Sequence, residues 1–292
     1  MKFAHIADTH IKNLKYHKEY RAVFGQLYRT LREQKVDYII HCGDIAHTKT
    51  QISPEFVELC SDFLKNLADI APTYVILGNH DGNLRNSYRQ DAITPIVDAL
   101  GHKNLHLLKN AGETHLDDKY CLNTLSVFDE DNWVKPSNPD KINIGLYHGA
   151  IKYSRTDIGF VMEHGEHDIS IFDDCDYSML GDIHKTQILN KEGTIAYAGS
   201  TIQQNFGETQ DKGMFIWDIK SKTEFTREKF NFINPKPFIT INLTKTGRIP
   251  KGFKCPDGAR LRLVSKSNIA LKRLRRAVDI AKHRFKPESI TF

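Results

Sequence analysis

Five short segments of the chain carry side chains that can bind a metal ion, and each follows a run of apolar residues. The segments are Asp8-Thr9-His10, Gly43-Asp44, Gly78-Asn79-His80-Asp81, His148 and Gly181-Asp182-Ile183-His184. The apolar runs are expected to be β-strands at 3–7, 38–42, 74–77, 142–147 and 177–180. Because ligands bind beyond the carboxyl ends of strands in open α/β sheets, we expect these side chains to meet at one edge.

The donor atoms in these segments are carboxylate oxygens, an amide oxygen and imidazole nitrogens, without a thiolate. Such a mixture suits manganese, iron or zinc. Asp44 is best placed by chain order to bridge two ions, and two ions about 3.5–4 Å apart can clamp a phosphate for in-line attack. A lone Asp-x-His is more often accidental than a ligand pair, and a lone Gly-Asp is usually a turn. Together they predict a metal site with the ligands Asp8, His10, Asp44, Asn79, His148, Asp182 and His184.

The elements that would position these loops alternate between strand and helix in the first half. Apolar residues recur at helical spacing over 20–31, and Ser53 and Pro54 are expected to open a second helix that extends to 67. A third helix is expected over 91–100, ended by Gly101. The second half is richer in strands, with further runs at 105–108, 194–198 and 214–218. This pattern predicts an α/β fold of two sheets packed face to face and flanked by helices.

Charge divides the chain into an acidic body and a basic C-terminal region. Residues 236–292 hold 15 Lys and Arg against 3 acidic residues, a net of +12, whereas residues 1–235 have a net of −7. We expect a main domain over 1–220, a polar linker over 221–237 and a small α+β capping domain over 238–292. The capping domain would contain strands at 238–243 and 260–264 and a basic amphipathic helix over 268–284. The candidate contacts on that helix with a polyanion such as DNA are Lys272, Arg273, Arg275 and Arg276.

Several classes of protein are disfavoured by composition. No apolar run approaches the length that spans a membrane, and the N-terminus lacks a signal-peptide pattern, so we expect a cytoplasmic protein. The five cysteines are scattered and form no Cys-x-x-Cys pair, which disfavours a disulfide framework or a zinc–thiolate site. For the basic region, the alternative to a polyanion partner is a solvated surface.

The metal-binding motifs together resemble those of the calcineurin-like metallophosphoesterases. Two further features, His47 and the segment from Gly199 to Gly213, are similar to the SbcD-type branch. That branch contains the DNA double-strand-break repair nucleases, including the meiotic-recombination nuclease. The resemblance covers about residues 1–218, and the chain is similar in size to bacteriophage recombination endonuclease subunits. The cytoplasm of a bacterium or of a phage-infected host is therefore the expected location.

The resemblance implies a role for each matching residue. The first ion would be held by Asp8, His10, Asp44 and His184, and the second by Asp44, Asn79, His148 and Asp182. His80 would protonate or stabilise the leaving oxygen, with Asp81 orienting its ring, and His47 would position DNA for exonucleolytic cleavage. Many members have histidine where this chain has Asp182. A carboxylate there should favour manganese or magnesium; alternatively, Asp182 lies outside the coordination sphere and orients a histidine.

The same resemblance implies a manganese-dependent DNA nuclease, a 3′–5′ exonuclease on double-stranded DNA and an endonuclease on single strands. Its partners would be DNA, a second copy bound through helices near 53–67 and 88–100, and an SbcC-type ATPase. The ATPase docks on helices beyond the capping domain, and this chain stops at Phe292. We therefore expect either a shortened chain or a different attachment. The alternatives are a phosphoprotein phosphatase, a nucleotide phosphodiesterase, or a DNA-end-binding scaffold with a weakened site.

Overall fold

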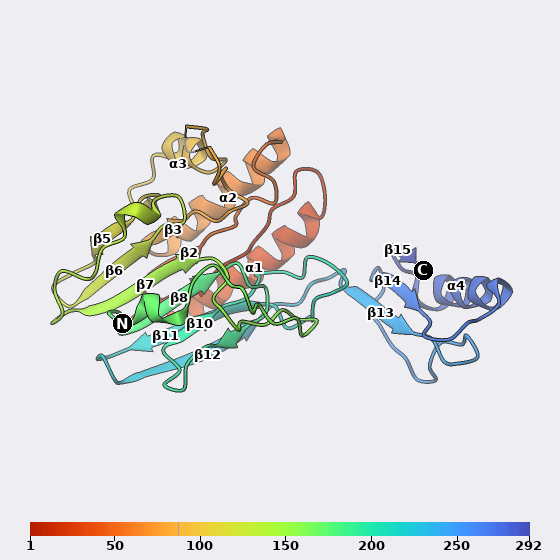
Figure 1. Cartoon of the computed structure of the whole chain (residues 1–292). Coiled ribbons are helices and arrows are strands. Elements are labelled where there is room, and N and C mark those ends of the chain that lie inside the picture. Colours follow the sequence, from red (N-terminus) through yellow and green to blue (C-terminus); the bar gives the residue numbers. More distant parts are fainter. Residues whose placement is uncertain (87) are drawn as a thin grey trace. The chain divides into compact units, whose positions relative to one another are not determined.

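The computed structural model of the chain describes residues 1–86 and 88–292, which form two compact units. Unit 1 comprises Met1–Ile202 and Asp211–Phe232, and unit 2 comprises Gln203–Gln210 and Ile233–Phe292. Figure 1 shows the elements of both units. Among the described residues, no helix has the length and apolar character needed to cross a membrane.

Unit 1 is built on two six-stranded sheets. The first has the order β12-β11-β1-β2-β3-β4, and β1 to β4 are parallel neighbours. Its strands are β1 (Lys2–Ile6), β2 (Tyr38–Cys42), β3 (Thr73–Ile76), β4 (Leu105–Leu108), β11 (Gly213–Ile219) and β12 (Phe225–Asn231). Four of these strands lie within one residue of the predicted runs at each end, and β11 contains the run at 214–218.

The second sheet has the order β5-β6-β7-β8-β10-β9, in which β6, β7, β8 and β10 are parallel. Its strands are β5 (Gly112–His115), β6 (Tyr120–Leu125), β7 (Ile142–His148), β8 (Tyr177–Gly181), β9 (Gln187–Ile188) and β10 (Ile195–Tyr197). A buried apolar core that includes Phe3, Leu146 and Trp217 draws on both sheets. The predicted α/β fold with two face-to-face sheets is therefore confirmed.

Helices α1 (His17–Gln34), α2 (Pro54–Ile70) and α3 (Thr94–Leu100) pack in a second core with apolar residues of the first sheet. The Ser53 hydroxyl accepts a hydrogen bond from the amide of Phe56 at 3.1 Å, so the predicted N-cap of α2 is confirmed. Helix α3 begins at Thr94 rather than near 91, because the Asp91 carboxylate caps the amides of Ile93 and Thr94. A short 3₁₀ helix, η2 (Ile169–Phe172), and neighbouring loops pack on the second sheet.

The prediction of a linker over 221–237 is wrong for residues 225–231, because these residues form β12 at the edge of the first sheet. Its sequence, Phe-Thr-Arg-Glu-Lys-Phe-Asn, is largely polar and charged, which is typical of a linker. The guanidinium of Arg227 lies 4.5 Å from the centre of the Trp217 ring, so an arginine covers apolar surface where an aliphatic side chain is more usual.

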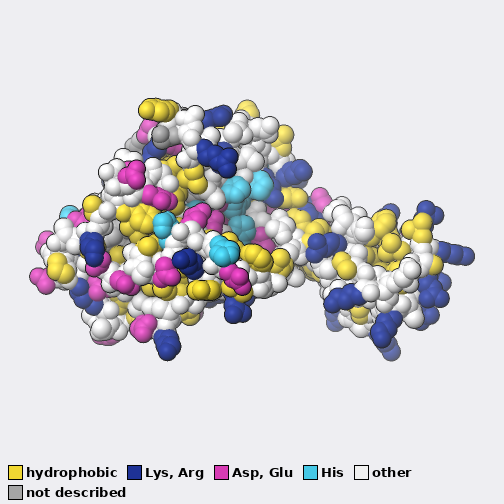
Figure 2. Space-filling model, in the orientation of Figure 1, with side chains coloured by type: hydrophobic (Ala, Val, Ile, Leu, Met, Phe, Trp, Pro, Cys, Tyr) yellow, Lys and Arg dark blue, Asp and Glu magenta, His cyan; other side chains and the backbone are white. Residues whose placement is uncertain are grey.

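Unit 2 contains a three-stranded parallel sheet and one long helix. The strands are β13 (Phe238–Asn242), β14 (Arg260–Val264) and β15 (Ser289–Thr291), with β14 in the middle. Helix α4 (Leu271–Phe285) buries Ala277, Ala281 and Phe285 in a small core shared with the sheet. Lysine and arginine side chains cover much of the face of this unit that Figure 2 shows.

Candidate metal centre

The predicted ligand segments meet at one edge of unit 1. Asp8 and Asp44 follow parallel strands of the first sheet, whereas His148 ends β7 and Asp182 follows β8 in the second. The two sheets are joined here, because the amide of Asp182 donates to both carboxylate oxygens of Asp8, at 2.9 and 3.2 Å. Figure 2 shows histidine and acidic side chains gathered at one place on this unit. The ligand segments therefore meet at the carboxyl ends of their strands, as expected for an α/β fold.

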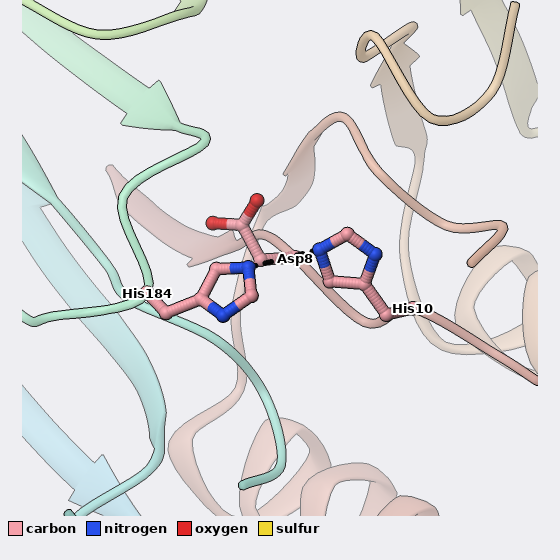
Figure 3. A group of neighbouring side chains, drawn as sticks. All are labelled: Asp8, His10 and His184. Carbon is pink, nitrogen blue, oxygen red and sulfur yellow. Dashed lines mark hydrogen bonds between the residues drawn. The ribbon is translucent and has the colours of Figure 1, made fainter. Parts of the chain in front are cut away.

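One group of ligand atoms comes from Asp8, His10 and His184 (Figure 3). Their nearest ligand atoms lie within 4.8 Å of one another, close enough to share one ion. The Nε2 atoms of the two histidines are 2.9 Å apart, so the rings point toward each other. Two imidazoles and a carboxylate are suitable ligands for manganese, iron or zinc.

Asp44 belongs to two further groups, with His10 and His80 and with Asp8 and His148. Its Oδ2 atom lies 3.4 Å from Nε2 of His10 and 3.3 Å from Nε2 of His148. Its other oxygen, Oδ1, accepts a hydrogen bond from the amide of His80 at 2.8 Å. One carboxylate oxygen therefore lies between histidines of both predicted sites, which is the geometry a bridging ligand needs.

Two buried polar atoms support the fit of a cation. Nδ1 of His148 lies 2.7 Å from the carbonyl oxygen of Cys42; because a carbonyl only accepts, Nδ1 carries the proton. A metal ion can therefore take the place of a proton at Nε2, an arrangement typical of metal-binding histidines whose Nδ1 donates to a carbonyl. Within residues 1–86 and 88–292, Nε2 of His148 and Oδ1 of Asn79 are both buried without a hydrogen-bond partner. A divalent cation would satisfy both atoms.

The electrostatics of the cluster also favour a cation. Burial raises the pKa of Asp8 to about 7, against the opposing attraction of His184 and His148. Burial alone would lower the pKa of His148, but the carboxylates of Asp44, Asp8 and Asp182 outweigh it and hold that pKa well above the usual range. Burial would raise the pKa of Asp44, but the His148 ring outweighs burial and lowers it. Carboxylates buried together thus draw positive charge, which bound metal ions supply.

The backbone is strained at four of the predicted ligands. Asp8, His10, Asp44 and Asp182 have positive φ angles of 50°, 48°, 56° and 95°. Residues other than glycine rarely adopt this backbone conformation. Such strain persists where the surrounding structure enforces it, often at functional sites. Its concentration at the ends of these strands indicates that the loops are shaped to aim the ligand atoms.

Two glycines allow the loops to approach closely. A Cβ atom added at Gly43 would lie 2.5 Å from Nδ1 of His148, and one added at Gly78 would overlap Oδ1 of Asp44. A side chain at either position would displace a predicted ligand.

Asp81 has a different role from the one expected. Its buried carboxylate does not orient His80; it accepts hydrogen bonds from the amides of Asp44, Ala46 and Gly78 at 2.8, 2.7 and 2.9 Å. The Nδ1 atom of His80 instead lies 2.9 Å from the carbonyl oxygen of His47 and donates to it. The expectation about Asp81 is therefore wrong, because the loop after β2 supplies the amides of Asp44 and Ala46 to Asp81 and the carbonyl of His47 to the His80 ring.

Replacing Asp81 with alanine should destabilise unit 1 by about 3–5 kcal/mol, because three buried amides would lose their acceptor. Urea unfolding of the variant measures this change as a lower midpoint. The matched control is Asp62→Ala, which removes a half-exposed ion pair with Arg21 and should change stability by less than about 1 kcal/mol. Equal midpoints for the two variants would contradict the role given to Asp81.

His47 and Asp182 lie at the margin of the cluster. The His47 ring is stacked near His80, with centroids 6.1 Å apart, and its centroid is 5.6 Å from that of His10. Asp182 places Oδ1 3.8 Å from Nε2 of His148, and its side chain is 22% exposed. Its assignment as a direct ligand stays a prediction, as does the alternative that it orients His148.

The predicted DNA contacts all lie on α4 of unit 2. Arg273 and Arg276 line a cavity of about 540 Å³, while Lys272 and Arg275 are exposed elsewhere on the helix. The cavity is also lined by Arg284, near the end of the same basic helix, and by Arg248, and neither is among the predicted DNA contacts. Arg248 is in a turn remote in sequence from α4, so no local pattern links it to the helix.

Several known proteins are similar to this chain. The family model of the calcineurin-like phosphoesterases matches residues 1–186. An uncharacterized protein of Acanthamoeba polyphaga mimivirus, R555, is 34% identical over 275 residues, which are 89% of this chain and 20% of that protein. The DNA double-strand break repair protein Mre11 of Archaeoglobus fulgidus is 24% identical over 238 residues, which are 71% of this chain and 52% of Mre11.

The chain thus spans about a fifth of one of these relatives and about half of the other. Among solved structures, a dimetal phosphatase from Danio rerio aligns with a TM-score of 0.46 at 9% identity, over 78% of this chain and 98% of that one.

Proposed function

The chain belongs to the calcineurin-like phosphoesterase family, and from that premise we propose that it is a manganese-dependent DNA nuclease of the SbcD type. The observation that favours DNA over a smaller phosphate ester as the substrate is a cavity in unit 2. This cavity is lined by four arginines, Arg248, Arg273, Arg276 and Arg284. Lysine and arginine supply most of the affinity that proteins have for DNA phosphates. The similarity to Mre11 supports the same choice.

Seven side chains would hold the ions in this proposal. Asp8, His10, Asp44 and His184 would bind the first ion, and Asp44, Asn79, His148 and Asp182 the second. Divalent ions in such a site polarise phosphoryl oxygens and provide a nucleophile at neutral pH. The three carboxylates favour a hard ion, so manganese is proposed, with magnesium as the other hard candidate.

His80 is the proposed general acid. Its Nδ1 atom donates to the His47 carbonyl, so Nε2 is the ring nitrogen that would carry the transferred proton. The side chain is exposed, and its amide is bound to Asp44, which fixes it beside the predicted ions. It would donate its Nε2 proton to the oxygen that leaves when a phosphodiester bond breaks. His47 would contact the DNA strand on the same side.

The proposed activities are 3′–5′ exonuclease on double-stranded DNA and endonuclease on single strands, in DNA end processing, recombination and repair in the cytoplasm. The proposed partners are DNA, an SbcC-type ATPase and a second copy of the chain. An apolar groove of about 330 Å³ between α2 and α3 supports the dimer. It is lined in part by Ile52, Val57, Ile96 and Leu100, and the first two are more than a third exposed.

An assay with manganese on three substrates tests this proposal. End-labelled blunt duplex DNA should be shortened from its 3′ ends, and circular single-stranded DNA should be cut internally. A small chromogenic phosphodiester should be hydrolysed as well. Hydrolysis of the small ester without cleavage of DNA would favour a phosphodiesterase or phosphatase, and DNA binding without any hydrolysis would favour an end-binding scaffold.

A further inference from the structure

A tight hairpin of unit 1, residues 153–162, exposes large apolar side chains. Ile158 and Phe160 at its tip are 76% and 62% exposed, and Tyr153 at its base is 69% exposed. The two arms are joined by backbone hydrogen bonds from Tyr153 to Met162 at 2.8 Å and from Thr156 to Phe160 at 2.9 Å. Apolar side chains clustered on a surface often mark an interaction site.

The hairpin is fixed to the backbone that carries a predicted metal ligand. The carboxylate of Asp157 pairs with the ammonium of Lys212 at 2.6 Å, and these side chains are only 5% and 3% exposed. The same ammonium donates to the carbonyl oxygen of His184 at 2.7 Å. The Gln187 side chain also binds both the amide and the carbonyl of Arg155, at 3.0 and 2.8 Å. The tip therefore keeps a fixed position relative to His184.

These anchoring contacts add little to the free energy of folding. Burying an ion pair removes two charges from water, and the gain in attraction often only offsets that loss. Tyr153 also has a positive φ of 66°, in a region that large side chains rarely adopt. A buried ion pair and a strained residue that together hold exposed apolar groups in place indicate a positioning function.

The chemistry of the hairpin fits nucleobases. Aromatic side chains stack on bases for about 1–3 kcal/mol each, and apolar side chains inserted between base steps unstack them. Lys152 and Arg155 are exposed on the same segment and can contact the flanking phosphates. A narrow tip of two side chains is small for a protein partner, since stable interfaces bury about 800 Å² on each side.

We infer that the hairpin is a wedge that stacks on, and unpairs, the terminal bases of the duplex presented to the metal centre. The inference rests on the proposed nuclease function. It adds a step to that function: an exonuclease must draw one strand away from its partner, and Ile158 and Phe160 would occupy the place of the lost base contacts.

The test compares blunt duplex DNA with the same duplex carrying three mismatched terminal pairs. For the double variant Ile158→Ser/Phe160→Ser, kcat/KM on the blunt duplex should fall about tenfold or more, which matches the loss of the stacking contact of Phe160. On the frayed duplex, kcat/KM should change less than twofold, because no pair remains to be opened. Val134→Ser is the matched control, since Val134 is 55% exposed in the same unit.

A binding measurement without cleavage gives a second readout. With calcium in place of manganese, wild-type protein should increase the fluorescence of 2-aminopurine at the second base pair of the blunt duplex, and the double variant should not. Equal losses on blunt and frayed duplexes, or no loss on either, would overturn the wedge. If wild-type protein cuts neither duplex, the proposed nuclease function itself fails.

Discussion

Replacement of Asp44 by asparagine is expected to lower kcat on DNA by about 10³-fold, because loss of a shared metal ligand removes on the order of 4 kcal/mol of transition-state stabilisation. Asparagine has nearly the same shape as aspartate, and its Oδ1 can still accept from the His80 amide. The fold should therefore persist while one charge between His10 and His148 is lost. Isothermal titration with manganese should show weakened binding at both sites.

The control for this variant is Asp98→Asn, which changes an exposed carboxylate on α3. Its activity and metal content should equal those of the wild type. If Asp44→Asn lost one manganese ion and kept the other at wild-type affinity, Asp44 would not be the bridging ligand.

The second large effect is expected at His80. His80→Ala should lower kcat on DNA by about 10²–10⁴-fold, the usual contribution of a general acid. Both manganese ions should remain bound, because the seven predicted ligands are unchanged. The defect should be much smaller on a p-nitrophenyl phosphodiester, whose leaving group departs as a stable anion and needs no proton.

His102→Ala is the matched control, because His102 is a histidine paired with the exposed Asp69 on the surface of unit 1. It should cut DNA at the wild-type rate. His80 also belongs to a possible ligand group with His10 and Asp44. A His80→Ala protein that loses a manganese ion, with equal defects on both substrates, would make His80 a ligand rather than an acid.

The meeting of the ligand segments could be predicted from the sequence for a physical reason. Strands such as β1, β2 and β8 are apolar runs that end at Asp or Gly-Asp, and the carboxyl ends of parallel strands meet at one edge. The start of α2 could also be predicted from the sequence, because Ser53 and Pro54 form a local capping signal. Both inferences depend on local sequence and a general rule of topology.

The features that the sequence does not predict depend on contacts between residues remote in sequence. The partner of the His80 ring is the backbone carbonyl of His47. Because every residue has a backbone carbonyl, the residue type at this position does not indicate the contact. The Asp157–Lys212 pair joins residues 55 positions apart. Strand β12 was concealed because Arg227 takes an apolar role against Trp217. In each case three-dimensional context, rather than local pattern, decides the outcome.

The most direct measurement of the two-metal claim is an anomalous difference map, recorded near the manganese absorption edge from crystals soaked in manganese. We predict two peaks about 3.5–4 Å apart, the spacing of two-metal sites. Asp44 should contact both, with His10 and His184 at one peak and Asn79 and His148 at the other. A single peak, or two peaks that do not share Asp44, would contradict the account.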